Sequence, residues 1–211
     1  MNVARLGWRN LWRNTRRSLI TIAGLSFAFG FLIVVIGFSR GFILQLVRNG
    51  TESMISHIQV HADGYLPDRT LYNTLGGAEG TDWPALLTRI RQAPAVRHAS
   101  PRVYAVGLLS TGTRSAGGEL VGVDPVHEGA LNRLFTPDLA AALSAGHTIA
   151  LGERLALDIG AQIGDEVAVI APAADGTQGN GLFRVAAIIH AGLPAVDRTL
   201  AMLRIDDAQA L

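Results

Sequence analysis

The sequence predicts an α+β protein in which one N-terminal transmembrane helix and a helical stalk carry a mixed α/β soluble domain. Residues 18–39 hold no charged side chain. After residue 57 the apolar spacing changes from helical to alternating. Charge is also divided: residues 1–51 hold seven Arg and no acid (+7), and residues 52–211 hold eleven Arg and seventeen acids (−6). The predicted segments are a cytoplasmic basic amphipathic helix (1–17), a transmembrane helix (18–39), a stalk (40–56) and an extracytoplasmic domain (57–211).

The uncharged run has the length of a membrane span. It holds 22 residues from Ser18 to Ser39, and a helix needs about 20 to cross a hydrocarbon core about 30 Å thick. A signal peptide has an apolar region of about 7–15 residues and a small-residue cleavage site, and residues 39–44 contain no A-x-A pattern. We interpret the run as an uncleaved span, with an atypical signal peptide or a buried core helix as alternatives. Because most nearby arginines precede it, the N-terminus is predicted to be cytoplasmic.

The segment before the span combines arginine with tryptophan. Arginine recurs every four residues from Arg5 to Arg17, which forms one stripe on a helix. Two tryptophans at such a position are typical of the membrane interface. One interpretation is that these arginines only set the topology; the other is that they bind anionic lipid or a cytoplasmic protein. The candidate interface or coupling residues are Trp8, Arg9, Trp12, Arg13, Arg16 and Arg17.

Small residues recur at a spacing of four within and just after the span. Such spacing lets a second helix backbone approach closely, although small residues are also common in spans that pack against nothing. The candidate helix-packing residues are Gly24, Ala28, Gly37 and Gly41. Their presence favours a helix that belongs to a bundle over a simple tether.

The soluble part alternates strand and helix patterns. We expect strands at 57–61, 102–111, 118–123, 148–151, 166–171, 182–190 and 200–205, with a hairpin joining the second and third. A first helix is predicted from a cap at Thr81 or Asp82 to just before Pro94, with its leucines facing inward. A second helix follows Thr136-Pro137-Asp138 and ends at Gly146, and a short third one covers 153–159.

The composition excludes several kinds of chemistry. The chain has no Cys and all eighteen basic residues are Arg, so a P-loop lysine, a Lys Schiff base, a Cys nucleophile and a disulfide are impossible. The G-x-S-x-G string at 37–41 ends an expected membrane helix, where a nucleophile elbow cannot form. His57 and His61 lack an acidic partner, and His127-Glu128 lacks the second His of H-E-x-x-H. We therefore predict no catalytic, cofactor-binding or metal-binding residue, and no nucleic-acid partner.

In chain order, these pieces resemble bacterial ABC-transporter permeases of the MacB/FtsX/LolC-LolE type. The opening "LGWRNLWRNTRRSLIT" is similar to the R-N-L-x-R-x-x-x-R-[ST] string that runs into the first span of that family. Three later stretches are similar to its MacB-like periplasmic core domain: "SHIQVHADGY", "IALGERLALDIGAQIGDEVAVIA" and "FRVAAIIHAGLPAVDRTLAMLRIDDAQAL".

The resemblance implies a bacterial inner-membrane permease that exports or extracts lipoprotein, lipid, peptide or drug. ATP hydrolysis would take place on a partner ABC ATPase, and motion would pass to the periplasmic domain. Further implied partners are a second permease half or a homodimer, membrane lipids, and a periplasmic or lipoprotein partner. The family continues into three more spans after the position of Leu211, so we expect a fragment of a permease or a split half. The alternatives are a single-span anchored extracytoplasmic enzyme and a structural envelope module.

Overall fold

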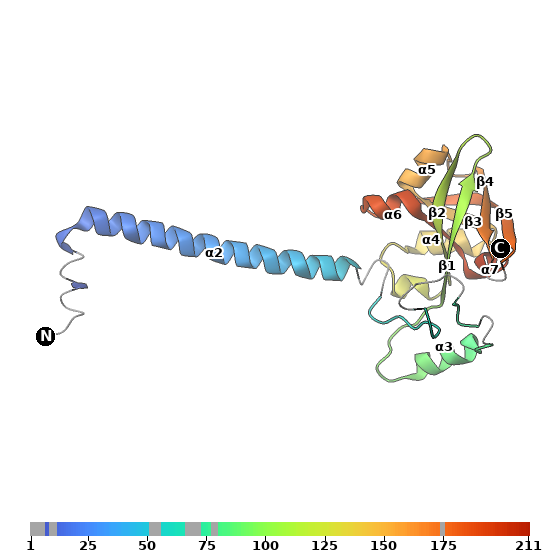
Figure 1. Ribbon diagram of the computed structural model, residues 1–211, viewed down its shortest axis with the longest axis horizontal. Coiled ribbons are helices and arrows are strands. Elements are labelled where there is room, and N and C mark those ends of the chain that lie inside the picture. Colours follow the sequence, from blue (N-terminus) through green and yellow to red (C-terminus); the bar gives the residue numbers. More distant parts are fainter. Residues whose placement is uncertain (1–6, 9–11, 51–55, 66–72, 77–79, 174–175) are drawn as a thin grey trace. The chain divides into compact units, whose positions relative to one another are not determined.

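The computed structural model describes residues 7–8, 12–50, 56–65, 73–76, 80–173 and 176–211 (Figure 1). The chain divides into two compact units, residues 1–50 and 51–211. Helix α2 (Thr15–Gly50) dominates the first unit. It is one uninterrupted helix, so the predicted span and the start of the predicted stalk belong to the same element. The predicted break at Gly50 and Thr51 coincides with the end of this helix, and Thr51 lies outside the described residues.

The second unit is a six-stranded closed barrel with short helices around it. Its strands follow the order β1-β2-β6-β3-β5-β4, and β4 pairs back with β1. The β2–β6 and β3–β5 pairs are parallel and the other four pairs are antiparallel. The strands are β1 (Arg102–Ser110), β2 (Ser115–Val123), β3 (Thr148–Gly152), β4 (Glu166–Pro172), β5 (Gln178–Ile189) and β6 (Leu200–Arg204). The helices are α3 (Trp83–Gln92), η2 (Glu128–Ala130), α4 (Pro137–Ser144), α5 (Glu153–Ile159), α6 (Pro194–Thr199) and α7 (Ile205–Gln209).

Two apolar cores lie on opposite faces of the central strands. Successive side chains of a strand point to opposite faces, and in β3 Ile149 and Leu151 enter one core while Ala150 enters the other. The first core also contains Leu109 of β1 and Val167 of β4. Because both faces of β3 and β6 are covered, these strands appear in the sequence as continuous apolar runs.

Helices with apolar faces pack against the barrel and complete its two cores. Leu139 and Leu143 of α4 are buried in the second core, and Leu155 and Ile159 of α5 are buried in the first. The tight approach between β3 and α6 requires glycine: a Cβ at Gly152 would lie 2.5 Å from the Asp197 carbonyl oxygen. The soluble domain is therefore a sheet closed on itself with helices packed on the outside, which confirms the mixed α/β prediction.

Two predicted helix caps are present. The Asp82 carboxylate accepts a hydrogen bond from the Ala85 N–H at 3.1 Å, and the Thr136 hydroxyl accepts one from the Leu139 N–H at 3.3 Å. Helix α5 occupies the predicted residues 153–159. The predicted hairpin is β1–β2, although its turn is shorter than predicted because β2 begins at Ser115.

One predicted strand is wrong. Residues 57–61 have the alternating pattern but belong to no strand ladder among the described residues, and Ile58 remains 81% exposed. Alternation specifies which faces of a strand are apolar, but a strand also needs a hydrogen-bonded neighbour. Two boundaries also differ: β5 begins at Gln178, not Leu182, because 178–181 pair with β4, and Ile205 begins α7 and does not end β6.

Candidate functional site

Helix α2 has the length and exposure of a membrane-spanning segment. Residues Thr15–Gln45 are apolar enough to cross a bilayer, and the apolar window within them is not buried against any part of the protein. Large apolar side chains cover it, including Phe27 (76% exposed) and Phe38 (74% exposed). Outside a membrane this surface would be an extreme case of exposed apolar area. The continuous helix through residues 37–41 also excludes a nucleophile elbow there, because that motif needs a strand-to-helix turn.

The candidate packing residues lie on two sides of α2. A helix turns about 100° per residue, so Gly24 and Ala28 lie about 140° around the axis from Gly37 and Gly41. Beyond the adjacent residues and the neighbouring helix backbone, no heavy atom lies within 4 Å of the position that a Cβ would take at Gly24, Gly37 or Gly41. The helix therefore presents two separate small-residue faces, one in each half.

The described tryptophan and arginine residues just before and in the first turn of α2 are exposed. Trp8 and Trp12 are 65% and 67% exposed, and their ring centroids lie 6.3 Å apart. Arg13, Arg16 and Arg17 are also exposed, whereas Arg9 lies outside the described residues. The described part of this N-terminal segment thus exposes two neighbouring indole rings and three guanidinium groups.

The soluble domain contains a buried ion pair that the sequence did not reveal. Glu128, on η2, is fully buried and accepts hydrogen bonds from Arg102 Nε (3.3 Å) and Nη2 (2.5 Å). Asn132 Nδ2 donates to the same carboxylate at 3.2 Å, and Arg102 Nη1 donates to the Tyr104 hydroxyl at 3.1 Å. Burial by itself lowers the pKa of Arg102, but the adjacent Glu128 charge and its hydrogen bonds outweigh burial and raise that pKa above its usual value. The pair joins the start of β1 to the turn after β2.

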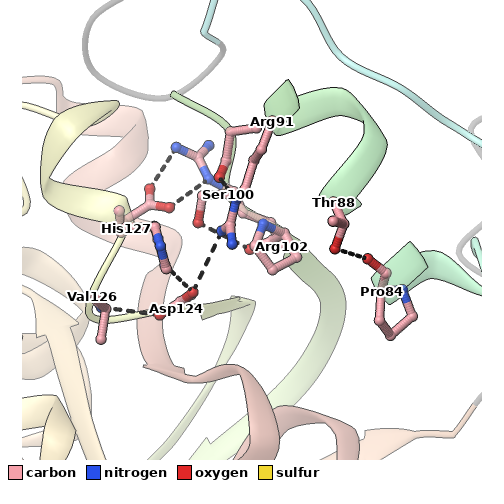
Figure 2. A network of polar contacts seen from close by, with 11 residues as sticks. Pro84, Thr88, Arg91, Ser100, Arg102, Asp124, Val126 and His127 are labelled. Atoms are coloured by element: carbon pink, nitrogen blue, oxygen red, sulfur yellow. Dashed lines mark hydrogen bonds and ion pairs between the residues drawn. The ribbon is translucent and has the colours of Figure 1, made fainter. Parts of the chain in front are cut away.

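A second set of contacts extends this network to helix α3 (Figure 2). Asp124 Oδ2 lies 2.6 Å from His127 Nδ1 and 3.9 Å from Arg91 Nη2. Arg91 Nε also donates to the Ala99 carbonyl oxygen at 3.0 Å. His127 is therefore held by an aspartate, and Glu128 by an arginine, so the pair His127-Glu128 serves structure here.

Two surface hollows on the described part of the domain differ in character. One, of about 600 Å³, lies between β1, β4 and the β4–β5 turn, and its described lining contains no titratable side chain. The other, of about 390 Å³, includes His147, Glu166 and Arg184. His147 has a left-handed backbone (φ 49°), held by its N–H to Asp207 Oδ2 (3.0 Å) and by its carbonyl oxygen, which accepts from the Arg184 N–H (3.0 Å). These bonds account for the strained backbone without a ligand.

Two further histidines, His61 and His190, form local pairs. His61 Nε2 lies 3.1 Å from Gln59 Oε1 and its ring stacks on Tyr65 at 4.1 Å. His190 Nδ1 lies 2.6 Å from Glu153 Oε2, and this hydrogen bond, then the charges of Glu153 and Asp197, raise the pKa of His190 above its usual value. No cluster of three or more potential metal ligands occurs in the part of the chain that the structure describes.

Comparison with known proteins identifies the family. The profile of the MacB-like periplasmic core domain matches residues 18–209. The lipoprotein-releasing system transmembrane protein LolC of Neisseria meningitidis is 27% identical over 203 residues, which cover 92% of this chain and 46% of that protein. LolC proteins of two Xylella fastidiosa strains, 9a5c and Temecula1, are each 24% identical and cover 91% and 92% of this chain.

The match covers most of this chain but only part of each relative. The chain spans about half the length of the curated relatives it matches, 45% or 46% in each case. The profile begins inside α2 and ends inside α7, so it includes both the apolar helix and the barrel. The resemblance noted in the sequence is thus confirmed, and the chain belongs to the family of the MacB-like periplasmic core domain.

Proposed function

We propose that this chain is a membrane subunit of an ABC-transporter permease and transmits ATP-driven motion from the cytoplasm to a domain outside the inner membrane. The observation that carries the proposal is the order of its parts: a span-length apolar helix leads into a family-defining barrel, and one family profile covers both. The LolC relatives are named as components of a lipoprotein-releasing system. Lipoprotein, lipid, peptide or drug remain the candidate cargoes of this chain.

In this proposal the cytoplasmic end of α2 is the coupling element. The guanidinium groups of Arg13, Arg16 and Arg17 are exposed and precede the span directly. Arginine binds carboxylates and phosphates through a planar fork, so this segment suits anionic lipid headgroups or acidic side chains of an ATPase. Trp8 and Trp12 would fix its depth at the headgroups.

The small-residue faces of α2 support membership of a helix bundle. With Gly24 and Ala28 on one side and Gly37 and Gly41 on another, the helix can pack against two neighbours at different depths. These neighbours would be spans of a second permease half or of a second copy. A simple tether needs no such faces.

The proposal is tested by purifying the tagged chain from membranes of its native host and measuring ATP hydrolysis in the complex. We expect an ATPase to co-purify. The variant Arg13→Gln/Arg17→Gln should retain membrane insertion but lose most of the associated hydrolysis, because the contact with the ATPase is weakened. The control Arg97→Gln/Arg198→Gln removes the same charge from exposed positions of the soluble domain and should leave hydrolysis unchanged. Equal hydrolysis in both variants would contradict the coupling role.

A further inference from the structure

The N-terminal unit carries positive charge without any acidic residue to balance it. Residues 1–51 hold seven arginines, and the first acid of the chain is Glu52. Three of these arginines, Arg13, Arg16 and Arg17, lie in the described part of the chain and are exposed. They belong to the compact unit of residues 1–50. Because this unit contains no acid, the counter-charge for its arginines has to come from outside the unit.

Two tryptophans indicate the depth at which these arginines lie. The rings of Trp8 and Trp12 are neighbours, with their planes inclined at 58°, and both are exposed. An indole with an apolar body and a polar N–H is typical of the headgroup level of a membrane. Trp12 directly precedes Arg13, and Arg16 and Arg17 follow in the first turn of α2. The three guanidinium groups are therefore expected at the level of the lipid phosphates.

Phosphate is the anion that this depth supplies and that arginine binds well. The planar guanidinium group can donate two parallel, charge-assisted hydrogen bonds to two phosphate oxygens. A zwitterionic lipid also brings a cationic group, which offsets the attraction, whereas an anionic lipid brings a net negative charge. Each arginine near an anionic surface strengthens binding by about fivefold. Charge complementarity thus favours an anionic phospholipid over a zwitterionic one.

We propose that Arg13, Arg16 and Arg17, flanked by Trp8 and Trp12, bind the phosphate of an anionic phospholipid in the leaflet that faces the N-terminus. The inference deepens the proposed function and rests on it for the side of the membrane on which that leaflet lies. The bound lipid fixes the depth of the start of α2, so displacement of this end is transmitted along the helix. A contact with an ATPase is still possible, because each guanidinium has more N–H donors than one phosphate oxygen accepts.

Quenching of tryptophan fluorescence by brominated lipid measures this preference in the full 211-residue chain. Trp83→Phe leaves Trp8 and Trp12 as the tryptophans of the chain. This variant is reconstituted into vesicles of equal amounts of phosphatidylglycerol and phosphatidylcholine, with one of the two lipids brominated at a time. We expect a preference of about fivefold or more for phosphatidylglycerol at low salt. Equal quenching by the two lipids would overturn the proposal.

Substitution of the arginines assigns the preference to this segment. In the Trp83→Phe background, Arg13→Gln/Arg16→Gln/Arg17→Gln should abolish the preference for phosphatidylglycerol, and the corresponding triple lysine variant should retain most of it because the charges remain. A preference that survives in the glutamine variant would contradict the site. Inorganic phosphate should reduce the preference no more than chloride of the same ionic strength. A specific loss in phosphate would mean that the arginines bind free phosphate and not a lipid.

A matched control removes the same charge elsewhere. Arg40→Gln/Arg97→Gln/Arg198→Gln substitutes three exposed arginines outside the segment and should leave the preference unchanged; an equal loss in this variant would show that only the net charge of the chain matters. Both leaflets of the vesicles have the same composition, so the direction of insertion does not affect the result. The vesicles contain no ATPase. A lipid preference in a chain with which no ATPase co-purifies would therefore refute the proposed function and leave the lipid site in place.

Discussion

Removal of the Arg102 guanidinium should destabilise the soluble domain more than any other single change of a charged side chain in the buried network. Glu128 is fully buried, and the Arg102 side chain is 11% exposed. Arg102→Met keeps most of the aliphatic length but leaves the Glu128 carboxylate with the Asn132 amide as its one side-chain donor among the described residues. Loss of one partner from a buried ion pair costs about 3–5 kcal/mol, because the remaining charge stays desolvated.

The expected thermal shift follows from the size of the unit. For a domain of about 150 residues, 1 kcal/mol corresponds to about 2–4 °C in Tm, so Arg102→Met should lower Tm by about 6–20 °C. The assay is thermal unfolding of the detergent-solubilised chain, followed by near-ultraviolet circular dichroism.

A double substitution separates the charge effect from packing. In Arg102→Met/Glu128→Leu both charges are gone, and replacement of a buried pair by apolar side chains is often close to neutral. The double variant should therefore be more stable than Arg102→Met alone. Two results would contradict this role of the ion pair. One is a free energy of unfolding for Arg102→Met within about 1 kcal/mol of the wild-type value. The other is a double variant that is less stable than both the wild type and Arg102→Met.

Three further predictions concern other parts of the chain. Glu153 raises the pKa of His190 in the folded state, so the contribution of this pair to stability is present at low pH and is lost as the pH rises through the folded pKa. Glu153→Gln should lower the pKa of His190 in an NMR titration. An unchanged titration curve would exclude the contact. Thr136→Ala removes the hydroxyl that caps α4 and should cost about 1 kcal/mol, measured as the change in Tm, whereas Thr136→Ser should retain most of the stability. Gly37→Ile should weaken association of α2 with neighbouring spans, measured by crosslinking in membranes. Ile36→Phe adds bulk on a side of the helix away from both small-residue faces and should not weaken it; equal effects would contradict the role of those faces.

Local chemistry explains which helices could be predicted. Helices α3 and α4 have side-chain caps at Asp82 and Thr136, and both could be read in the sequence. Three short helices, η2, α6 and α7, were not predicted, and none of them has a side-chain hydrogen bond at its N-cap. Each of these helices joins neighbouring elements and buries a single residue, such as Ile205 of α7. One buried residue produces no periodic apolar pattern in the sequence.

The closed barrel itself could not be predicted from the pattern of apolar residues. Strands β3 and β6 could be recognised as apolar runs. The order of strands in the barrel, however, depends on pairs between residues far apart in the chain, such as Leu108 of β1 with Ile170 of β4. The Arg102–Glu128 pair was hidden for the same reason. Its partners are separated by 26 residues, and an arginine at the start of a strand resembles an exposed one.

The account depends most on α2 spanning a membrane with the arginine segment and the barrel on opposite sides. The absence of native cysteine allows this to be measured by single-cysteine labelling in intact spheroplasts with a membrane-impermeant maleimide. Val126→Cys, at a position 82% exposed on the soluble domain, should be labelled directly, and Gly7→Cys should be labelled only after the membrane is permeabilised. If both cysteines are labelled in intact spheroplasts, or if neither is labelled before permeabilisation, the arginine segment and the barrel lie on the same side of the membrane. Either result would contradict the account.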